Sequence, residues 1–134
     1  MKKVRGYIFS RPFMGERVPQ HVQNIVIRDY CERNGLHFLL SAAEYAMESS
    51  DLIFEEVLSE LSEIDGIVAY SLYQLPEDDI KRNHIYNQIV DVKKNLYFAV
   101  EGLQASSMQD CERIEILWRV RQTLPNCLQY RSNK

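Results

Sequence analysis

Short apolar runs alternate with amphipathic segments along the whole chain, and this alternation constrains the fold more than any other feature. The apolar runs are residues 4–9, 36–43, 67–70 and 96–100. They do not alternate strictly between apolar and polar residues, which is typical of strands covered on both faces. The order predicts a single α/β domain that contains a mostly parallel four-stranded sheet with helices on both faces.

Amphipathic segments predict helices between and after these strands. The first begins near Pro19, which suits the first turn of a helix, and stops at Asn34-Gly35. Its apolar stripe at helical spacing consists of Val22, Ile25, Val26 and Tyr30. Two more helices are predicted over residues 51–64 and 77–95. A C-terminal helix is predicted over residues 107–124, where Pro125 stops it, and residues 125–134 are expected to form a polar tail.

Composition limits the classes of function. A length of 134 residues suits one domain, and 46% apolar with 26% charged residues is an ordinary globular composition. A net charge of -3 argues against a nucleic-acid partner. Three widely spaced cysteines support neither a disulfide framework nor a zinc site. No apolar run suits a signal peptide or a membrane helix, so we expect a cytoplasmic protein without a membrane partner. We also expect no metal and no cofactor.

Polar side chains follow each predicted strand at its carboxyl end, where open α/β sheets bind ligands. Arginine grips carboxylates and phosphates with two parallel hydrogen bonds, and a carboxylate beside a hydroxyl can act as a base. The candidate catalytic residues are Ser10, Arg11, Glu44, Ser71 and Glu101. The candidate ligand-binding residues are Phe13, Glu16, Arg17, Tyr73 and Gln74. The alternative is purely structural, because strand ends meet water in any α/β domain, and Arg11 could simply pair with Glu44.

The loop over residues 10–19 is longer than the usual connection of about 2–6 residues between a strand and a helix. Loops of unusual length are often functional, so this segment is the predicted anion grip and lid of a site. Phe13 has no periodic position in a core. It could pack locally, or it could line a pocket or a partner surface.

Several segments resemble the catalytic domain of serine recombinases of the resolvase and invertase type. They are residues 6–11, Gln20, Gln23, Gly35, Glu44, residues 65–68, Leu72 and Leu75, and the similarity covers roughly residues 4–105. The resemblance implies a parallel-rich sheet with helices on both sides. It also implies association through a late helix, so we expect a homo-oligomer, either a dimer or a tetramer.

The recombinase chemistry is not matched at the motif positions. The family carries Tyr-x-Arg-Val-Ser on its first strand, and matching its tyrosine to Tyr7 puts Phe9 at the arginine and Arg11 at the nucleophilic serine. Residues 73–78 match an arginine-containing loop of the family but hold no arginine. Those arginines stabilise the transferring phosphate. A DNA recombinase is therefore the least favoured function.

A second resemblance spans residues 4–128. The runs over residues 5–13, 66–76, 98–103, 113–115 and 122–125 resemble the small bacterial family of sporadic carbohydrate cluster proteins. That family implies a setting among genes for surface polysaccharides, and no mechanism. We therefore expect a protein of surface-carbohydrate biosynthesis that binds or acts on a sugar or nucleotide sugar. The alternative is a non-catalytic partner or scaffold protein that reuses a recombinase-like fold, and the sequence leaves open whether the protein is an enzyme.

Overall fold

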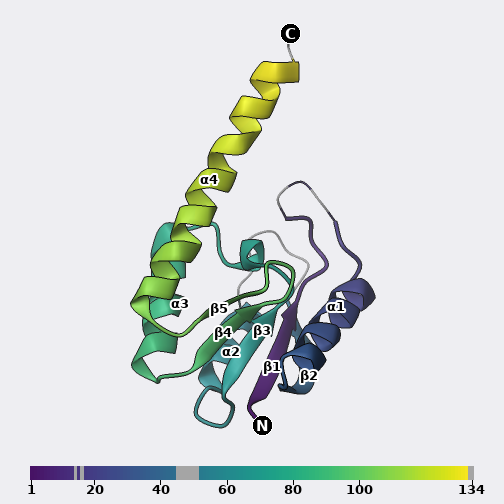
Figure 1. The fold of residues 1–134 in the computed structure, drawn as a ribbon, viewed down its shortest axis with the longest axis vertical. Coiled ribbons are helices and arrows are strands. Elements are labelled where there is room, and N and C mark those ends of the chain that lie inside the picture. Colours follow the sequence, from purple (N-terminus) through teal and green to yellow (C-terminus); the bar gives the residue numbers. More distant parts are fainter. Residues whose placement is uncertain (14, 16, 45–51, 133–134) are drawn as a thin grey trace.

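The computed structural model describes residues 1–13, 15, 17–44 and 52–132, with side chains described up to Thr123 (Figure 1). Glu16, one of the candidate ligand-binding residues, lies outside the described residues. The elements are β1 (Lys3–Ile8), α1 (Gln20–Arg33), β2 (His37–Ala43), α2 (Leu52–Ser59), β3 (Gly66–Ala69), the short 3-10 helix η1 (Leu72–Gln74), α3 (Asp79–Asp91), β4 (Asn95–Phe98), β5 (Leu103–Ala105) and α4 (Met108–Ser132).

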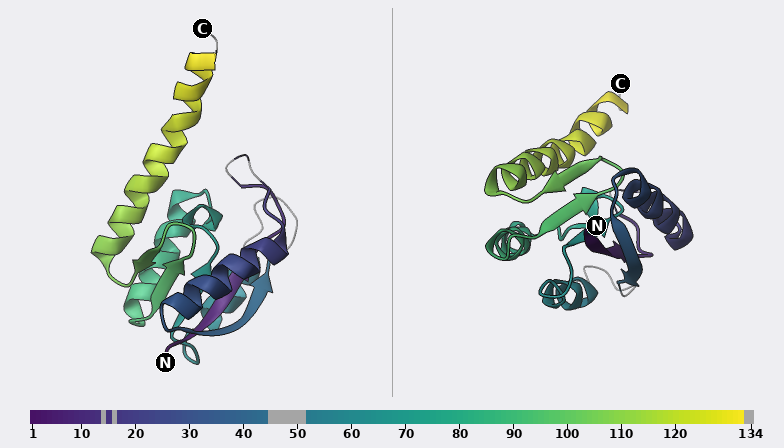
Figure 2. Two further views of the ribbon diagram at one scale, coloured as in Figure 1. Left: turned by 45° about the vertical axis from the view of Figure 1, so that its right-hand side comes forward. Right: turned by 60° about the horizontal axis from the view of Figure 1, so that its bottom comes forward.

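The strands form one five-stranded sheet in the order β2-β1-β3-β4-β5. Among the described strands, β1 runs parallel to β2 and β3, β3 runs parallel to β4, and β5 runs antiparallel to β4. Helix α1 covers one face, where Ile27 and Tyr30 pack with Val4 and Val68. Helices α2, α3 and α4 contribute to the core on the other face (Figure 2). The predicted α/β domain with helices on both faces is therefore confirmed.

The fifth strand is absent from the prediction, which had four. Gly102 begins the return from β4 with a φ of 66°, a left-handed conformation that favours glycine. Strand β5 then pairs Leu103 with Phe98 and Ala105 with Leu96. A three-residue strand is too short to show a periodic pattern, so the sequence does not distinguish it from a loop.

Helix α4 is longer than predicted. It continues through Pro125 to Ser132, where we expected a helix end near Leu124 and a polar tail. A proline removes one backbone donor and crowds the preceding turn, which makes a helix end common but does not require one. The last turns of α4 project away from the rest of the domain (Figure 1).

The buried face of α1 also differs from the predicted stripe. Its buried residues are Gln23, Ile27, Tyr30 and Cys31, whereas Ile25 is 63% exposed. The helix is rotated so that the amide of Gln23 reaches the end of the sheet, where it satisfies backbone groups that would otherwise be buried without partners. Among the described residues, no helix is long and apolar enough to span a bilayer.

Candidate functional site

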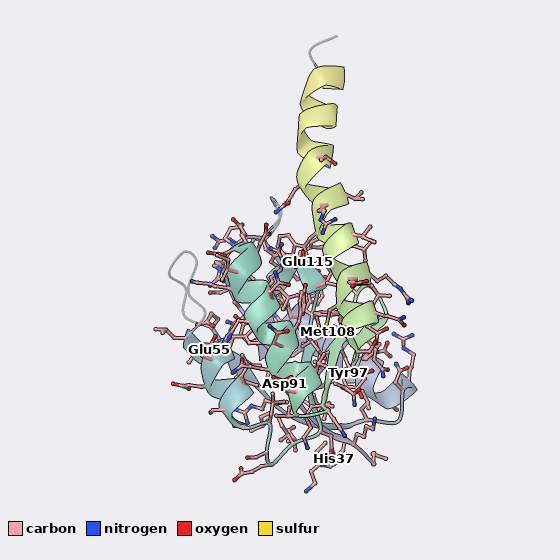
Figure 3. All side chains as sticks on the ribbon, turned by 90° about the vertical axis from the view of Figure 1, so that its left-hand side faces the viewer. His37, Glu55, Asp91, Tyr97, Met108 and Glu115 are labelled. Atoms are coloured by element: carbon pink, nitrogen blue, oxygen red, sulfur yellow. The ribbon has the colours of Figure 1, made fainter. Side chains whose placement is uncertain are left out.

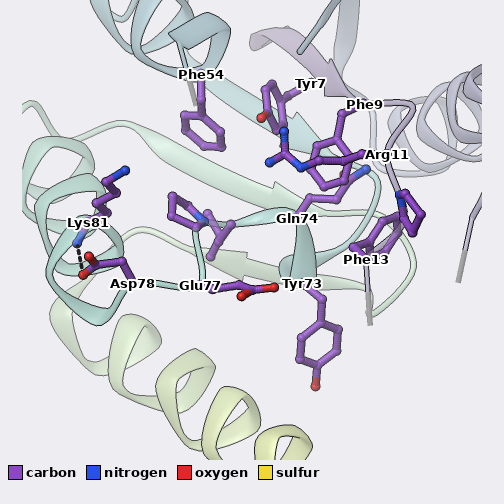
Figure 4. A pocket seen from close by; sticks show the side chains of 13 residues that line it. Tyr7, Phe9, Arg11, Phe13, Phe54, Tyr73, Gln74, Glu77, Asp78 and Lys81 are labelled. Atoms are coloured by element: carbon purple, nitrogen blue, oxygen red, sulfur yellow. Dashed lines mark hydrogen bonds between the residues drawn. The ribbon is translucent and has the colours of Figure 1, made fainter. Parts of the chain in front are cut away.

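A cavity of about 390 Å³ lies at the carboxyl ends of β1 and β3, beside the first turn of α3 (Figure 4). Aromatic rings provide much of its wall, and they belong to Tyr7, Phe9, Phe13, Phe54 and Tyr73. The charged groups in its lining are Arg11, Glu77, Asp78 and Lys81. The volume falls within the range of small-molecule sites, about 300–1,000 Å³. The candidate site residues were also expected at this edge of the sheet.

Arg11 lies across the ring of Phe9, with 4.2 Å between its Cζ atom and the ring centroid (Figure 4). This cation–π contact holds a guanidinium in the wall of the cavity. Phe9 in turn makes an edge-to-face contact with Phe13, with 5.4 Å between the ring centroids. Phe13 therefore fulfils both interpretations left open by the sequence, because it packs against the core and also lines the cavity.

The side chains of Ser10 and Arg11, which follow β1, point in different directions. Side chains of an extended segment alternate between the two faces of a sheet. Tyr7, Phe9 and Arg11 face the cavity, whereas Ile8 packs with the core under α1. Ser10 is half-buried and is not among the residues that line the cavity. Arg17 is exposed and does not line the cavity either.

Glu44 is a buried capping residue for α2. Its Oε1 accepts a hydrogen bond from the backbone N–H of Ile53 at 3.1 Å, and its Oε2 accepts one from Phe54 at 3.1 Å. The Tyr7 hydroxyl donates to the same carboxylate at 3.0 Å. A carboxylate at a helix N-terminus satisfies free donors and interacts favourably with the helix dipole. Glu44 is not among the lining residues of the cavity, and it orients Tyr7, which is one of them.

Two buried glutamines join the ends of β1 and β3. Gln74 donates from Nε2 to Oε1 of Gln23 at 2.8 Å and accepts from the backbone N–H of Tyr70 at 3.0 Å. Gln23 donates to the carbonyl oxygens of Phe9 and Val18, at 2.7 and 2.8 Å. The amide pair thus fixes the strand ends that carry the aromatic wall. Gln74 was a predicted ligand-binding residue and lines the cavity, whereas Gln23 was not singled out as a site residue.

Ser71 and Glu101 are adjacent, as the strand-end argument predicts. The Ser71 hydroxyl donates to Oε2 of Glu101 at 2.7 Å, and the backbone N–H of Leu72 donates to Oε1 at 2.9 Å. Ser71 Oγ also accepts from the backbone N–H of Tyr73 at 3.2 Å. Ser71 is only 3% exposed, and neither it nor Glu101 lines the cavity. The geometry is that of a cap for η1.

The sequence did not single out three charged residues of the cavity lining, Glu77, Asp78 and Lys81. Lys81 and Asp78 lie at the start of α3, where Asp78 accepts a hydrogen bond from the backbone N–H of Ile80 at 2.8 Å and caps the helix. Acidic residues at the start of a helix are usually capping groups. Only the folded structure shows that this start of α3 lies near the end of β1 and lines the cavity. Among the described residues, no cluster of histidine, cysteine or acidic side chains could hold a metal ion.

Tyr73 connects the cavity with α4. Burial raises the pKa of its hydroxyl above the ordinary value, Glu101 adds to the rise, and Arg121 opposes it. The hydroxyl therefore stays protonated at neutral pH and donates to the carbonyl oxygen of Leu117 at 3.4 Å.

Comparison with known proteins identifies the fold. No family model matches the chain, and no curated protein matches it. The N-terminal catalytic domain of TP901-1 integrase superposes with a TM-score of 0.56 at 14% sequence identity, covering 92% of this chain and 98% of that chain. A resolvase family site-specific recombinase from Streptococcus pneumoniae superposes with a TM-score of 0.62 at 11% identity, covering 96% of this chain and 99% of that chain. The chain therefore has the fold of a resolvase-type recombinase catalytic domain.

Proposed function

We propose that the protein binds a small anionic carbohydrate, such as a sugar phosphate, a sugar acid or a nucleotide sugar, in the cavity at the ends of β1 and β3. The observation that carries this proposal is the guanidinium of Arg11, together with Lys81, in a cavity with aromatic walls. Arginine pairs with phosphate or carboxylate oxygens, aromatic rings pack against the flat face of a base, and the carboxylates of Glu77 and Asp78 accept from hydroxyl groups.

The proposed biological setting is the biosynthesis of bacterial surface carbohydrates in the cytoplasm. Its support is the sequence resemblance over residues 4–128 to the sporadic carbohydrate cluster family. The cavity geometry adds a requirement for the ligand, which must present a negative group near Arg11.

Binding is better supported than covalent chemistry. Ser71 and Glu44 are buried and engaged as caps, and Ser10 is absent from the cavity lining. Both solved neighbours are named as an integrase or a recombinase. DNA strand transfer is a weaker candidate for this chain, because Arg11 occupies the position matched to the recombinase nucleophile.

Replacing Arg11 by alanine is expected to weaken binding of glucose 1-phosphate by about 10- to 100-fold. The reason is the loss of charge-assisted hydrogen bonds, which contribute about 1.5–3 kcal/mol. Isothermal titration with glucose 1-phosphate, UDP-glucose and glucuronate measures the effect, and uncharged glucose is the ligand control. Arg17→Ala is the matched variant, because Arg17 is in the same loop but does not line the cavity. Equal losses in both variants, or no binding of any anionic probe to the wild type at millimolar concentration, would refute the proposal.

A second candidate function is that of a partner or scaffold protein that assembles through α4. Ile116 is 55% exposed and Val120 is 51% exposed, four residues apart on one side of this helix. The helix also projects beyond the domain (Figure 1). We propose that the wild type is a dimer or tetramer, and that Ile116→Glu with Val120→Glu converts it to a monomer. Light scattering after size exclusion checks this, and a monomeric wild type at 100 µM would remove the support for assembly.

A further inference from the structure

Arg82 of α3 is a buried cation with all its donors engaged. Its exposed fraction is 1%. Nε and Nη2 donate to the two carboxylate oxygens of Glu115 on α4, at 2.9 and 3.0 Å (Figure 3 labels Glu115). Nη1 donates to the carbonyl oxygens of Pro76 and Glu77, at 3.0 and 2.8 Å, and Nη2 also donates to Asp79. These contacts account for the five N–H groups of a guanidinium.

The contacts of Arg82 run in two directions. Pro76 and Glu77 line the cavity, whereas Glu115 belongs to α4. Burial alone would lower the pKa of Arg82, but the hydrogen bonds and charge of Glu115 raise it above the ordinary value. Arg82 is therefore a permanent cation that forms an ion pair with Glu115.

A second connection joins α4 to the same wall. Trp118 of α4 lies under the guanidinium of Arg82, with 4.3 Å from Cζ to the ring centroid. The same indole makes an edge-to-face contact with the ring of Tyr73, with 5.4 Å between centroids. Tyr73 also donates to the Leu117 carbonyl oxygen of α4. Of the lining residues, Tyr73 thus contacts α4 directly, whereas Pro76 and Glu77 are linked to α4 through Arg82.

We propose that Arg82 is a positioning residue for the ligand cavity. Arg82, fixed by its ion pair with Glu115, holds the backbone of Pro76 and Glu77 in place, so that ligand affinity depends on the packing of α4 against α3. The inference rests on the proposed function, since it names the control of the same cavity. A buried ion pair is often no more stabilising than an apolar contact of the same volume, so stability alone gives a weak reason for this arrangement. Fixed carbonyls and side chains at a cavity wall raise affinity, because less ordering is needed on binding.

The coupling must work in both directions. A ligand that prefers the ordered wall also favours the seated form of α4, because linkage between two binding equilibria is reciprocal. A partner on the exposed side of α4, which includes Ile116 and Val120, would change ligand affinity by the same factor as the ligand changes partner affinity.

The test compares Glu115→Gln with Glu112→Gln. Glu112 is exposed on the same helix and is not among the partners of Arg82. Amide hydrogen exchange is measured without ligand over residues 72–77, and glucose 1-phosphate affinity is measured by titration. We expect Glu115→Gln to speed exchange over residues 72–77 several-fold with unchanged exchange in β1, and to weaken glucose 1-phosphate about five- to tenfold. Glu112→Gln is expected to match the wild type in both measurements.

Unchanged exchange over residues 72–77 in Glu115→Gln would overturn the proposal, as would an equal increase throughout the domain. Glu115→Asp keeps the charge and removes one methylene, so it supplies a folded variant with an intermediate exchange rate if Glu115→Gln does not fold. The two proposals fail separately. If the wild type binds no anionic probe, the proposed function fails, and the ligand-free exchange still decides whether Arg82 positions the wall.

Discussion

Replacing Trp118 by alanine is expected to lower the free energy of unfolding by about 3–5 kcal/mol, as is usual for removing a large aromatic side chain from a core. Trp118 is fully buried and belongs to the core cluster between the sheet, α3 and α4. Its indole N–H has no hydrogen-bond partner among the described residues, so the loss comes from packing. The substitution also removes the ring under Arg82 and beside Tyr73.

Denaturant unfolding monitored by circular dichroism measures this effect. Arg119→Ala is the matched variant, because Arg119 is exposed on the same helix, and its change is expected to stay within about 0.5 kcal/mol. A loss below 1 kcal/mol for Trp118→Ala would contradict the packing of α4 against α3.

Replacing Gln23 by alanine is expected to cost about 3 kcal/mol, a large effect for a polar helix residue. The Gln23 side chain is fully buried and donates to the carbonyl oxygens of Phe9 and Val18. Its Oε1 accepts from the backbone N–H of Phe9 and from Gln74. Alanine would leave these groups buried without partners, at about 1–3 kcal/mol for each group that water does not reach.

Unfolding experiments on Gln23→Ala test this expectation against Gln109→Ala, an exposed glutamine in the first turn of α4. The control is expected to change stability by less than about 0.5 kcal/mol. If both variants lose the same small amount, the amide pair of Gln23 and Gln74 does not fix the strand ends.

The sheet was predictable because buried parallel strands are continuous apolar runs, and their carboxyl ends follow from the order of elements. Four of the predicted site residues, Arg11, Phe13, Tyr73 and Gln74, line the cavity. The direction of individual side chains was harder to predict. Ser10 and Arg11 are consecutive, and only the alternation of β1, anchored by Ile8 in the opposite core, puts the arginine in the cavity and the serine outside it.

Capping explains most of the remaining differences. Glu44, Ser71 and Glu101 are polar residues at strand ends, where they look like site residues, but each accepts hydrogen bonds from the start of a nearby helix. The backbone groups that such residues cap can be distant in sequence. Glu44, for example, caps a helix that begins at Leu52. Conversely, Arg82 follows the ordinary charge pattern of a surface helix, and only the packing of α4 shows that it is buried.

The central claim is that an anionic carbohydrate binds in the cavity at the ends of β1 and β3. The most direct test is a nuclear magnetic resonance titration of the labelled protein with glucose 1-phosphate, UDP-glucose and glucuronate. The account predicts saturable shifts at Phe9, Arg11, Tyr73 and Lys81, which line the cavity, with little change at His37, which lies beside the start of β1 at the opposite end of the sheet. Shifts confined to residues outside the cavity, or no shifts at millimolar concentrations of all three probes, would contradict it.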